Sequence, residues 1–141
     1  MNLAQEKRRL VAMVRQLADE YPFDLMPESH AVLLAFNCAA LADNARRRCE
    51  ARSDAIHEEL HSEHVHRYGE TWVRENAQTI RTGANIRISK DAVFKAAASE
   101  NEMYGRWANM YSQLAMARSS IAIRDALHSM LDENAFSVEE L

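Results

Sequence analysis

The segment richest in chemically active side chains is residues 57–66, with the sequence HEELHSEHVH. On a helix, His57, His61 and His64 share one face, because steps of three and four residues return to the same side. Imidazoles beside carboxylates are the ligands that zinc, iron and nickel take from proteins. These three histidines are therefore the candidate metal ligands of the chain, and a metal-binding helical bundle is one hypothesis for its function.

The same segment matches two enzyme motifs, but only over a few residues. His57-Glu58-x-x-His61 fits the His-Glu-x-x-His string of zinc proteases, which also need a third ligand and a cleft. Glu58-x-x-His61 and a second copy at 63–66 have the spacing of di-iron bundles, which take that motif from two different helices. The remaining sequence supplies none of these missing parts. We interpret the histidines as a solvated or interfacial helix face, and we predict no catalytic residue and no cofactor.

A second candidate site is the arginine-rich stretch 46–52, RRRCEAR. Three consecutive arginines spread around a helix, so only Arg48 and Arg52, four residues apart, share a face. Such a pair can bind phosphate, which makes a nucleic-acid-binding adaptor a further alternative. Acidic residues lie among the arginines, and the net charge of −4 gives no overall attraction to nucleic acid. We favour an ion-paired surface over a nucleic-acid site.

Both segments lie in a stretch from Glu28 to about Thr82 that contains no proline and one glycine, Gly69. Apolar and small residues recur along it at helical spacing. We predict a single long helix over about 28–82. Glycine costs about 1 kcal/mol in a helix interior, so an interruption at Gly69 is left open.

One helix is predicted on each side of this stretch. A near-heptad row of apolar residues from Leu3 indicates a helix over about 3–20, with Asn2 as its N-cap. A third helix is predicted over about 90–132, with Ser89 as its N-cap.

These lengths predict an all-α fold in one domain, residues 1–141. The two long helices form an elongated antiparallel hairpin or coiled coil, and the shorter N-terminal helix makes a three-helix bundle at one end. The few glycines and prolines, three and two in the whole chain, leave little room for β-hairpins.

A turn centred near Asn85 would set residues opposite each other when their numbers sum to about 170. The part of the hairpin from His57 to Trp107 would then lack a third helix and expose a group of aromatic side chains. An exposed apolar patch marks an interaction site, and two-fold pairing of identical chains is the commonest way to cover one. The residues predicted to mediate self-association or partner binding are Tyr68, Trp72, Tyr104, Trp107 and Tyr111.

The predicted function is therefore non-enzymatic. We expect a self-associating helical protein, a homodimer or higher oligomer, that acts by binding another protein as an adaptor, assembly factor, inhibitor or structural subunit. No apolar run approaches the roughly 18 residues that span a bilayer, and the first residues lack a signal-peptide pattern. Cys38 and Cys49 are interpreted as reduced core residues. We expect a cytoplasmic protein with no membrane partner.

Overall fold

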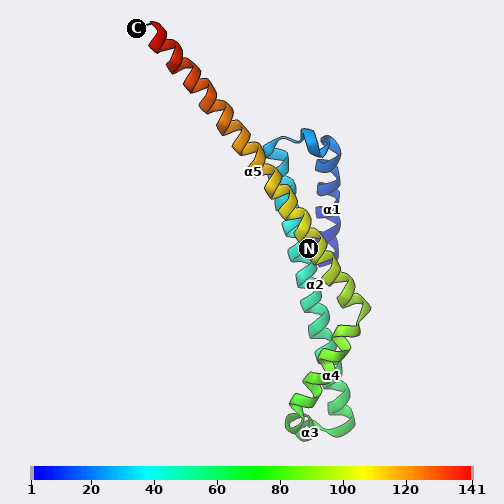
Figure 1. Ribbon diagram of the computed structural model, residues 1–141. Helices are drawn as coiled ribbons and strands as arrows, with labels where there is room; N and C mark the ends of the chain where they lie inside the picture. The colour runs from blue at the N-terminus through cyan, green and yellow to red at the C-terminus, as the bar shows by residue number, and fades with distance from the viewer. Residues whose placement is uncertain (1, 141) are drawn as a thin grey trace.

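The computed structural model describes residues 2–140, with side chains as far as residue 132. Every regular element among them is helical: α1 (Leu3–Glu20), the short 3₁₀ turn η1 (Phe23–Leu25), α2 (Glu28–Tyr68), α3 (Glu70–Glu75), α4 (Ala77–Lys90) and α5 (Ala92–Glu140). α2 and α5 pack along each other, and α1 lies against the first half of α2 (Figure 1). The predicted all-α hairpin with a shorter N-terminal helix is confirmed.

Helix α1 begins and ends where the sequence indicates. The Asn2 side chain accepts a hydrogen bond from the Gln5 backbone N–H at 2.8 Å, and the Gln5 side chain accepts one from the Asn2 N–H at 3.1 Å. This reciprocal pair is a capping box, which satisfies two N–H groups that have no partner inside the helix. The helix ends before Pro22, which cannot continue it.

The predicted single helix over 28–82 is wrong, because the chain turns at Gly69. Gly69 has φ 88°, a left-handed value that side chains other than glycine rarely adopt. α2 therefore ends at Tyr68, and the chain reverses through α3 into α4. The tip of the hairpin lies at residues 69–76, and the region around Asn85 that was predicted as the turn lies inside α4.

The chain bends a second time at Asp91, between α4 and α5. Its carboxylate accepts a hydrogen bond from the Phe94 backbone N–H at 2.9 Å, so Asp91 caps α5 in place of the predicted Ser89, which lies inside α4. Arg52 of α2 donates two further hydrogen bonds to this carboxylate, at 2.9 and 2.8 Å. Together the Arg52 guanidinium and the Phe94 N–H lower the pKa of Asp91 to about 2.

The pairing of α2 with α5 differs from the prediction by roughly 25 residues. The side chains that join the two helices, Arg52 to Asp91 and Arg48 to Glu100, have numbers that sum to 143 and 148 instead of 170. Because α2 begins at Glu28, it reaches α5 only as far as about residue 117. The rest of α5 continues beyond the bundle as a single helix (Figure 1).

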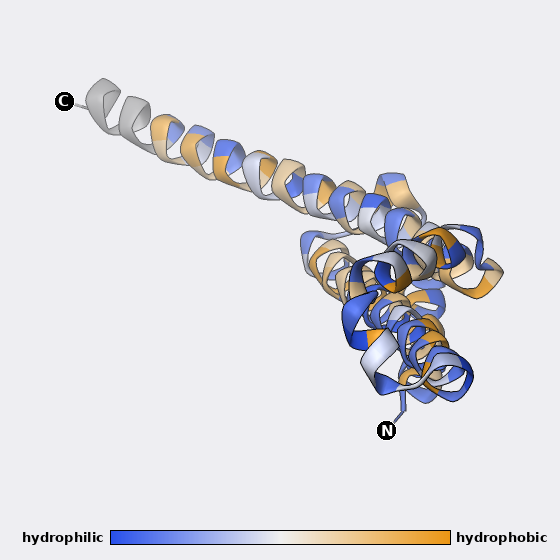
Figure 2. Cartoon of the chain, turned by 90° about the horizontal axis from the view of Figure 1, so that it is seen from below, coloured by the Kyte–Doolittle hydropathy of each residue, from blue (hydrophilic) through white to orange (hydrophobic). Residues whose placement is uncertain are grey.

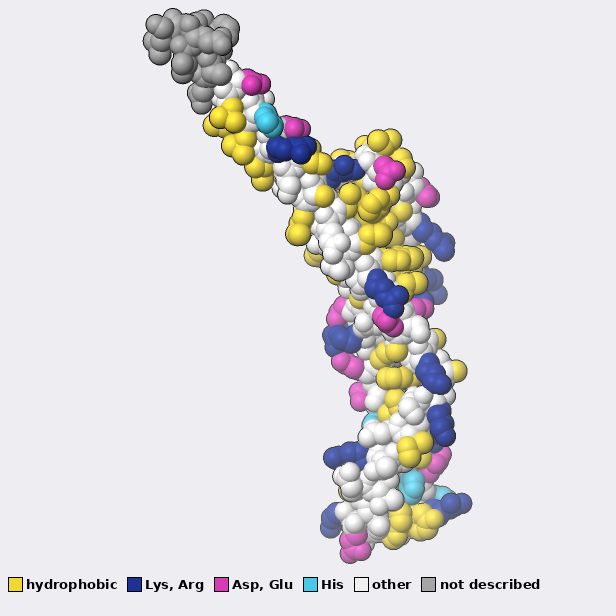
Figure 3. Space-filling model, viewed as in Figure 1, with side chains coloured by type: hydrophobic (Ala, Val, Ile, Leu, Met, Phe, Trp, Pro, Cys, Tyr) yellow, Lys and Arg dark blue, Asp and Glu magenta, His cyan; other side chains and the backbone are white. Residues whose placement is uncertain are grey.

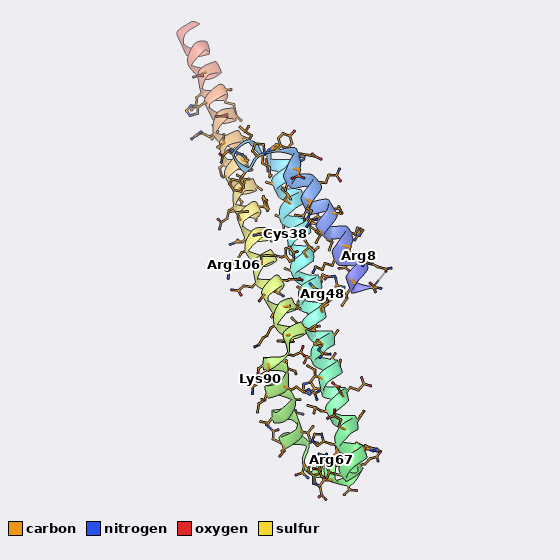
Figure 4. All side chains as sticks on the ribbon, turned by 90° about the vertical axis from the view of Figure 1, so that its right-hand side faces the viewer. Arg8, Cys38, Arg48, Arg67, Lys90 and Arg106 are labelled. Atoms are coloured by element: carbon orange, nitrogen blue, oxygen red, sulfur yellow. The ribbon has the colours of Figure 1, made fainter. Side chains whose placement is uncertain are left out.

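The three-helix bundle that the sequence predicts is present and holds the core. Its buried side chains come from all three helices: Leu10, Val14, Leu34, Cys38, Leu41, Tyr104 and Ala115. α5 contributes its middle, not its end as predicted. Figure 4 shows Cys38 on α2 at the level where α1 covers the hairpin.

Candidate interaction surface

The structure does not bring the three predicted metal ligands together. His64 stacks on Trp72, with ring centroids 5.7 Å apart, and its Nδ1 lies 2.6 Å from the Leu60 carbonyl oxygen. His57 and His61 instead line a surface cavity of about 630 Å³ between α2, α3 and α4. Among the side chains described to residue 132, no three histidine, cysteine, aspartate or glutamate side chains are close enough to hold a metal ion.

The two arginines of the nucleic-acid hypothesis join helices. Arg48 pairs with Glu100 of α5 and donates a hydrogen bond to the Asn44 side chain at 2.9 Å, while Arg52 pairs with Asp91. Figure 4 shows Arg48 on α2 near the lower end of α1. Both guanidinium groups already have carboxylate partners, so the ion-paired interpretation of this stretch is the one that the geometry favours.

The predicted aromatic residues lie in two separate groups. Tyr68 and Trp72 stack at the hairpin tip, with ring centroids 4.2 Å apart. Tyr104, Trp107 and Tyr111 lie in the first half of α5, where they face α1 and α2. The predicted single cluster depended on residue numbers summing to about 170, and the observed pairing separates its two halves.

The second aromatic group forms one wall of an apolar groove between α1 and α5. The groove has a cavity volume of about 340 Å³; α1 contributes Val11, Val14 and Ala18, and α5 contributes Tyr104, Trp107, Met110 and Tyr111. Trp107 and Met110 remain 41% and 40% exposed. Figure 3 shows hydrophobic side chains gathered along this line between the two helices. We call this surface the α1–α5 groove.

Among the described side chains, Arg118 makes the last hydrogen bonds from α5 to the bundle. Its guanidinium donates hydrogen bonds to the backbone carbonyls of Met26 at 3.0 Å and Asp24 at 2.5 Å. Residues 119–140 continue beyond this point, and every side chain described from 120 to 132 is exposed. We call residues 119–140 the projecting segment.

The projecting segment carries large apolar side chains that no other described part of the chain covers. Ile123, Leu127, Met130 and Leu131 are 54–62% exposed. Met116, just before the segment, together with Ile123, Leu127 and Met130, follows a spacing of seven, four and three residues, so these side chains share one face. Figure 2 shows hydrophobic and hydrophilic residues on different sides of this helix.

This exposed surface differs from the prediction, although the spacing that reveals it is visible in the sequence. Pairing of residues whose numbers sum to about 170 would have set the end of α5 against α2 and buried it. A separate exposed row lies on the outer side of α2, where Val32, Leu33 and Phe36 are 50%, 48% and 73% exposed. We call these three residues the α2 ridge.

Comparison with known proteins adds no family to this geometry: no family model, curated protein or solved structure matches the chain. No helix among the described residues combines the length and apolar character that crossing a membrane requires.

Proposed function

We propose that this is a non-enzymatic, self-associating helical protein that acts through protein–protein interaction, as an adaptor, assembly factor, inhibitor or structural subunit. The observation that carries the proposal is the projecting segment. Most helical stability in proteins comes from packing of an apolar face against other elements. This segment has such a face, and no other described part of the chain packs against it.

Energetics favour association through the segment. Burying a leucine, isoleucine or methionine side chain completely gains about 1.5–3 kcal/mol. The four large apolar side chains of the segment are more than half exposed, so each stands to gain roughly 1 kcal/mol on association. The α1–α5 groove and the α2 ridge add further apolar area at the same end of the molecule.

The two alternative functions gain no comparable support. The metal hypothesis needs His57, His61 and His64 to converge, but His64 is engaged with Trp72 and the Leu60 carbonyl. The nucleic-acid hypothesis needs Arg48 and Arg52 to face a phosphate, but both face carboxylates.

Sedimentation equilibrium over a range of protein concentrations tests the proposal. We expect the wild-type chain to have the mass of a dimer or a larger assembly, and the double variant I123E/L127E to shift toward the monomer. Asp125→Lys is the matched control, because Asp125 lies on the opposite face of the same segment and should leave the mass unchanged. A wild-type chain that stays monomeric at every concentration would contradict the proposal.

A further inference from the structure

We propose that the α1–α5 groove is the binding site for the projecting segment of a second copy, and that two copies exchange these segments reciprocally. This inference rests on the proposed self-association and assigns the site that performs it. Each chain would contribute one helix and one groove to the dimer.

Each of the two surfaces lacks the partner that the other provides. The groove is an apolar channel along one side of a three-helix bundle, where a fourth helix would complete a four-helix arrangement. The projecting segment is a helix whose apolar face is exposed as far as its side chains are described, to residue 132. It cannot fill the groove of its own chain, because α5 is one continuous helix that leads the segment away from the groove (Figure 1).

The projecting segment is long enough to cover the groove. Residues 119–140 extend about 33 Å at 1.5 Å per residue. α1, which forms one wall of the groove, has 18 residues and is about 27 Å long by the same measure, of which the groove-lining stretch 11–19 takes up about 13 Å. A partner segment that enters beside Arg118 could therefore follow α1 along its whole length.

The directions of the helices are also compatible with a closed dimer. α1 and α5 run in the same direction, since each is antiparallel to α2. A two-fold axis near the Arg118 end would bring in the partner's α5 antiparallel to both. Two-fold exchange uses the same pair of surfaces twice and leaves no open end for further addition.

The exposed apolar area approaches what a stable dimer needs only when both surfaces are counted. Burying a fully exposed large apolar side chain removes on the order of 100 Å² from water, so one that is about half exposed removes about 50 Å². The segment and Met116 supply five such half-exposed side chains, and the groove adds Trp107 and Met110. Together they supply on the order of 350 Å² of apolar surface per copy, which is most of the roughly 450 Å² that is apolar in the ~800 Å² per partner of a standard interface.

Charges at the two surfaces do not oppose this contact. By sequence, residues 119–140 carry one arginine against five carboxylates, whereas α1 carries four basic residues against three acidic ones. The net charges of the segment and of α1 therefore have opposite signs, and their electrostatic interaction does not oppose the contact.

The test uses three single variants of the full-length chain, each with glutamate in place of an exposed apolar residue. Met110→Glu places a charge in the groove, Leu127→Glu places one in the segment, and Phe36→Glu places one on the α2 ridge as the matched control. We expect Met110→Glu and Leu127→Glu each to raise the dimer dissociation constant roughly 100-fold over wild type in sedimentation equilibrium. Each substitution disrupts both of the symmetry-related contacts, because both chains of the dimer carry it. Phe36→Glu should change the dissociation constant by less than about 3-fold, a change typical of residues outside an interface.

Mixing the two interface variants gives the sharpest outcome. A Met110→Glu chain keeps an intact segment and a Leu127→Glu chain keeps an intact groove, so one of the two contacts can form between them. Native mass spectrometry should therefore detect a heterodimer in the mixture at concentrations where each variant alone is monomeric. Pairing of two segments with each other, without the groove, predicts no such recovery.

The possible failures are distinguishable. If the wild type dimerises but Met110→Glu leaves the dimer intact, or if the mixture forms no heterodimer, the assigned site is wrong and self-association stands. Loss of the dimer in Phe36→Glu alone would place the contact on the α2 ridge and also overturn the assignment. A monomeric wild type overturns both proposals. Circular dichroism checks each fold, and Ala18→Glu, on the opposite wall, replaces Met110→Glu if that variant unfolds.

Discussion

The polar junction around Glu100 allows a direct test of how the three helices are held together. Glu100 of α5 accepts a hydrogen bond from Lys7 of α1 at 2.6 Å and another from Arg48 of α2. Replacing it with glutamine keeps the shape but leaves two cations without their anion. The Lys7, Arg48 and Glu100 side chains are 31%, 24% and 26% exposed, so solvent screens the junction only in part.

The expected loss of unfolding free energy in Glu100→Gln lies between two limits. Hydrogen bonds to charged groups contribute about 1.5–3 kcal/mol when buried, whereas exposed ion pairs contribute about 0–1 kcal/mol. For this partly exposed junction we expect Glu100→Gln to lower the free energy of unfolding by about 1–2 kcal/mol. In a chain of this size that corresponds to a fall of about 3–8 °C in melting temperature.

Glu102 on the same helix provides the matched control. Its side chain is 67% exposed and pairs with Arg106 one turn away. Such helix-surface pairs contribute about 0.3–0.5 kcal/mol, so Glu102→Gln should shift the melting temperature by less than about 2 °C. Both variants are compared with wild type by circular dichroism at 222 nm and at one protein concentration, because association also changes the apparent stability.

The pH dependence of the Glu100→Gln effect separates charge from packing. Burial acts to raise the pKa of Glu100, but hydrogen bonds from Lys7 and Arg48 outweigh it and hold the pKa below its ordinary value of 4.5. A lowered pKa means that the carboxylate stabilises the fold above about pH 4.5, and that this stabilisation is lost as the pH falls through the folded-state value. The gap between wild type and variant should therefore close in acid. Equal effects of the two variants at pH 7, or a gap unchanged by pH, would refute the reasoning.

Three further predictions concern other contacts of the same helices. Arg118→Ala, which removes the hydrogen bonds to the η1 region, should lower the melting temperature clearly more than Arg106→Ala, measured by the same thermal scans. Asp91→Asn should lower the melting temperature at pH 7, and the difference from wild type should disappear between about pH 4 and pH 2. The pKa of Asp91 is lowered from its ordinary value of 3.8 to about 2, so the carboxylate stabilises the fold fully above pH 3.8 and no longer does so below the folded-state pKa. Burial raises the pKa of Cys38 to about 11, so at pH 8 a thiol reagent should modify the less buried Cys49 first and reach Cys38 only on unfolding.

The parts of the fold that the sequence predicts are those fixed by local interactions. Asn2, Gln5 and Pro22 are neighbours of the helix ends that they define, so α1 could be predicted to the residue. The position of the hairpin turn could not be predicted in this way. Gly69 and Gly83 have similar helix-compatible flanks, and only the three-dimensional fold shows that Gly69 adopts a positive φ while Gly83 continues α4.

The prediction of the candidate site depended on the position of the hairpin turn more than on any single motif. Arg48 and Arg52 find their partners 52 and 39 residues further along the chain, and no local pattern gives those distances without the pairing of the helices. Because the turn was predicted near Asn85 and not at Gly69, the two aromatic groups were expected to form one cluster and the end of α5 was expected to be buried. Tyr104 and Trp107 lie against α1 in the three-helix part of the bundle and not in the two-helix part where the prediction set them, and their role in self-association or partner binding stays a prediction.

One line of residues along α5 supports the proposal that the projecting segment has a partner. Positions seven apart lie nearly above one another on a helix, and on this line they are Glu102, Asn109, Met116, Ile123 and Met130. All five are exposed, so they differ in chemistry and not in accessibility. Where α2 lies beside α5, the line is polar at Glu102 and Asn109, as a solvent-facing row should be. From Met116, close to the level at which α2 begins at Glu28 and no longer accompanies α5, the line is apolar. A solvated spacer helix would have no physical reason for that change, because water surrounds it on every side. A helix that enters a second chain's apolar groove would need the change at this point.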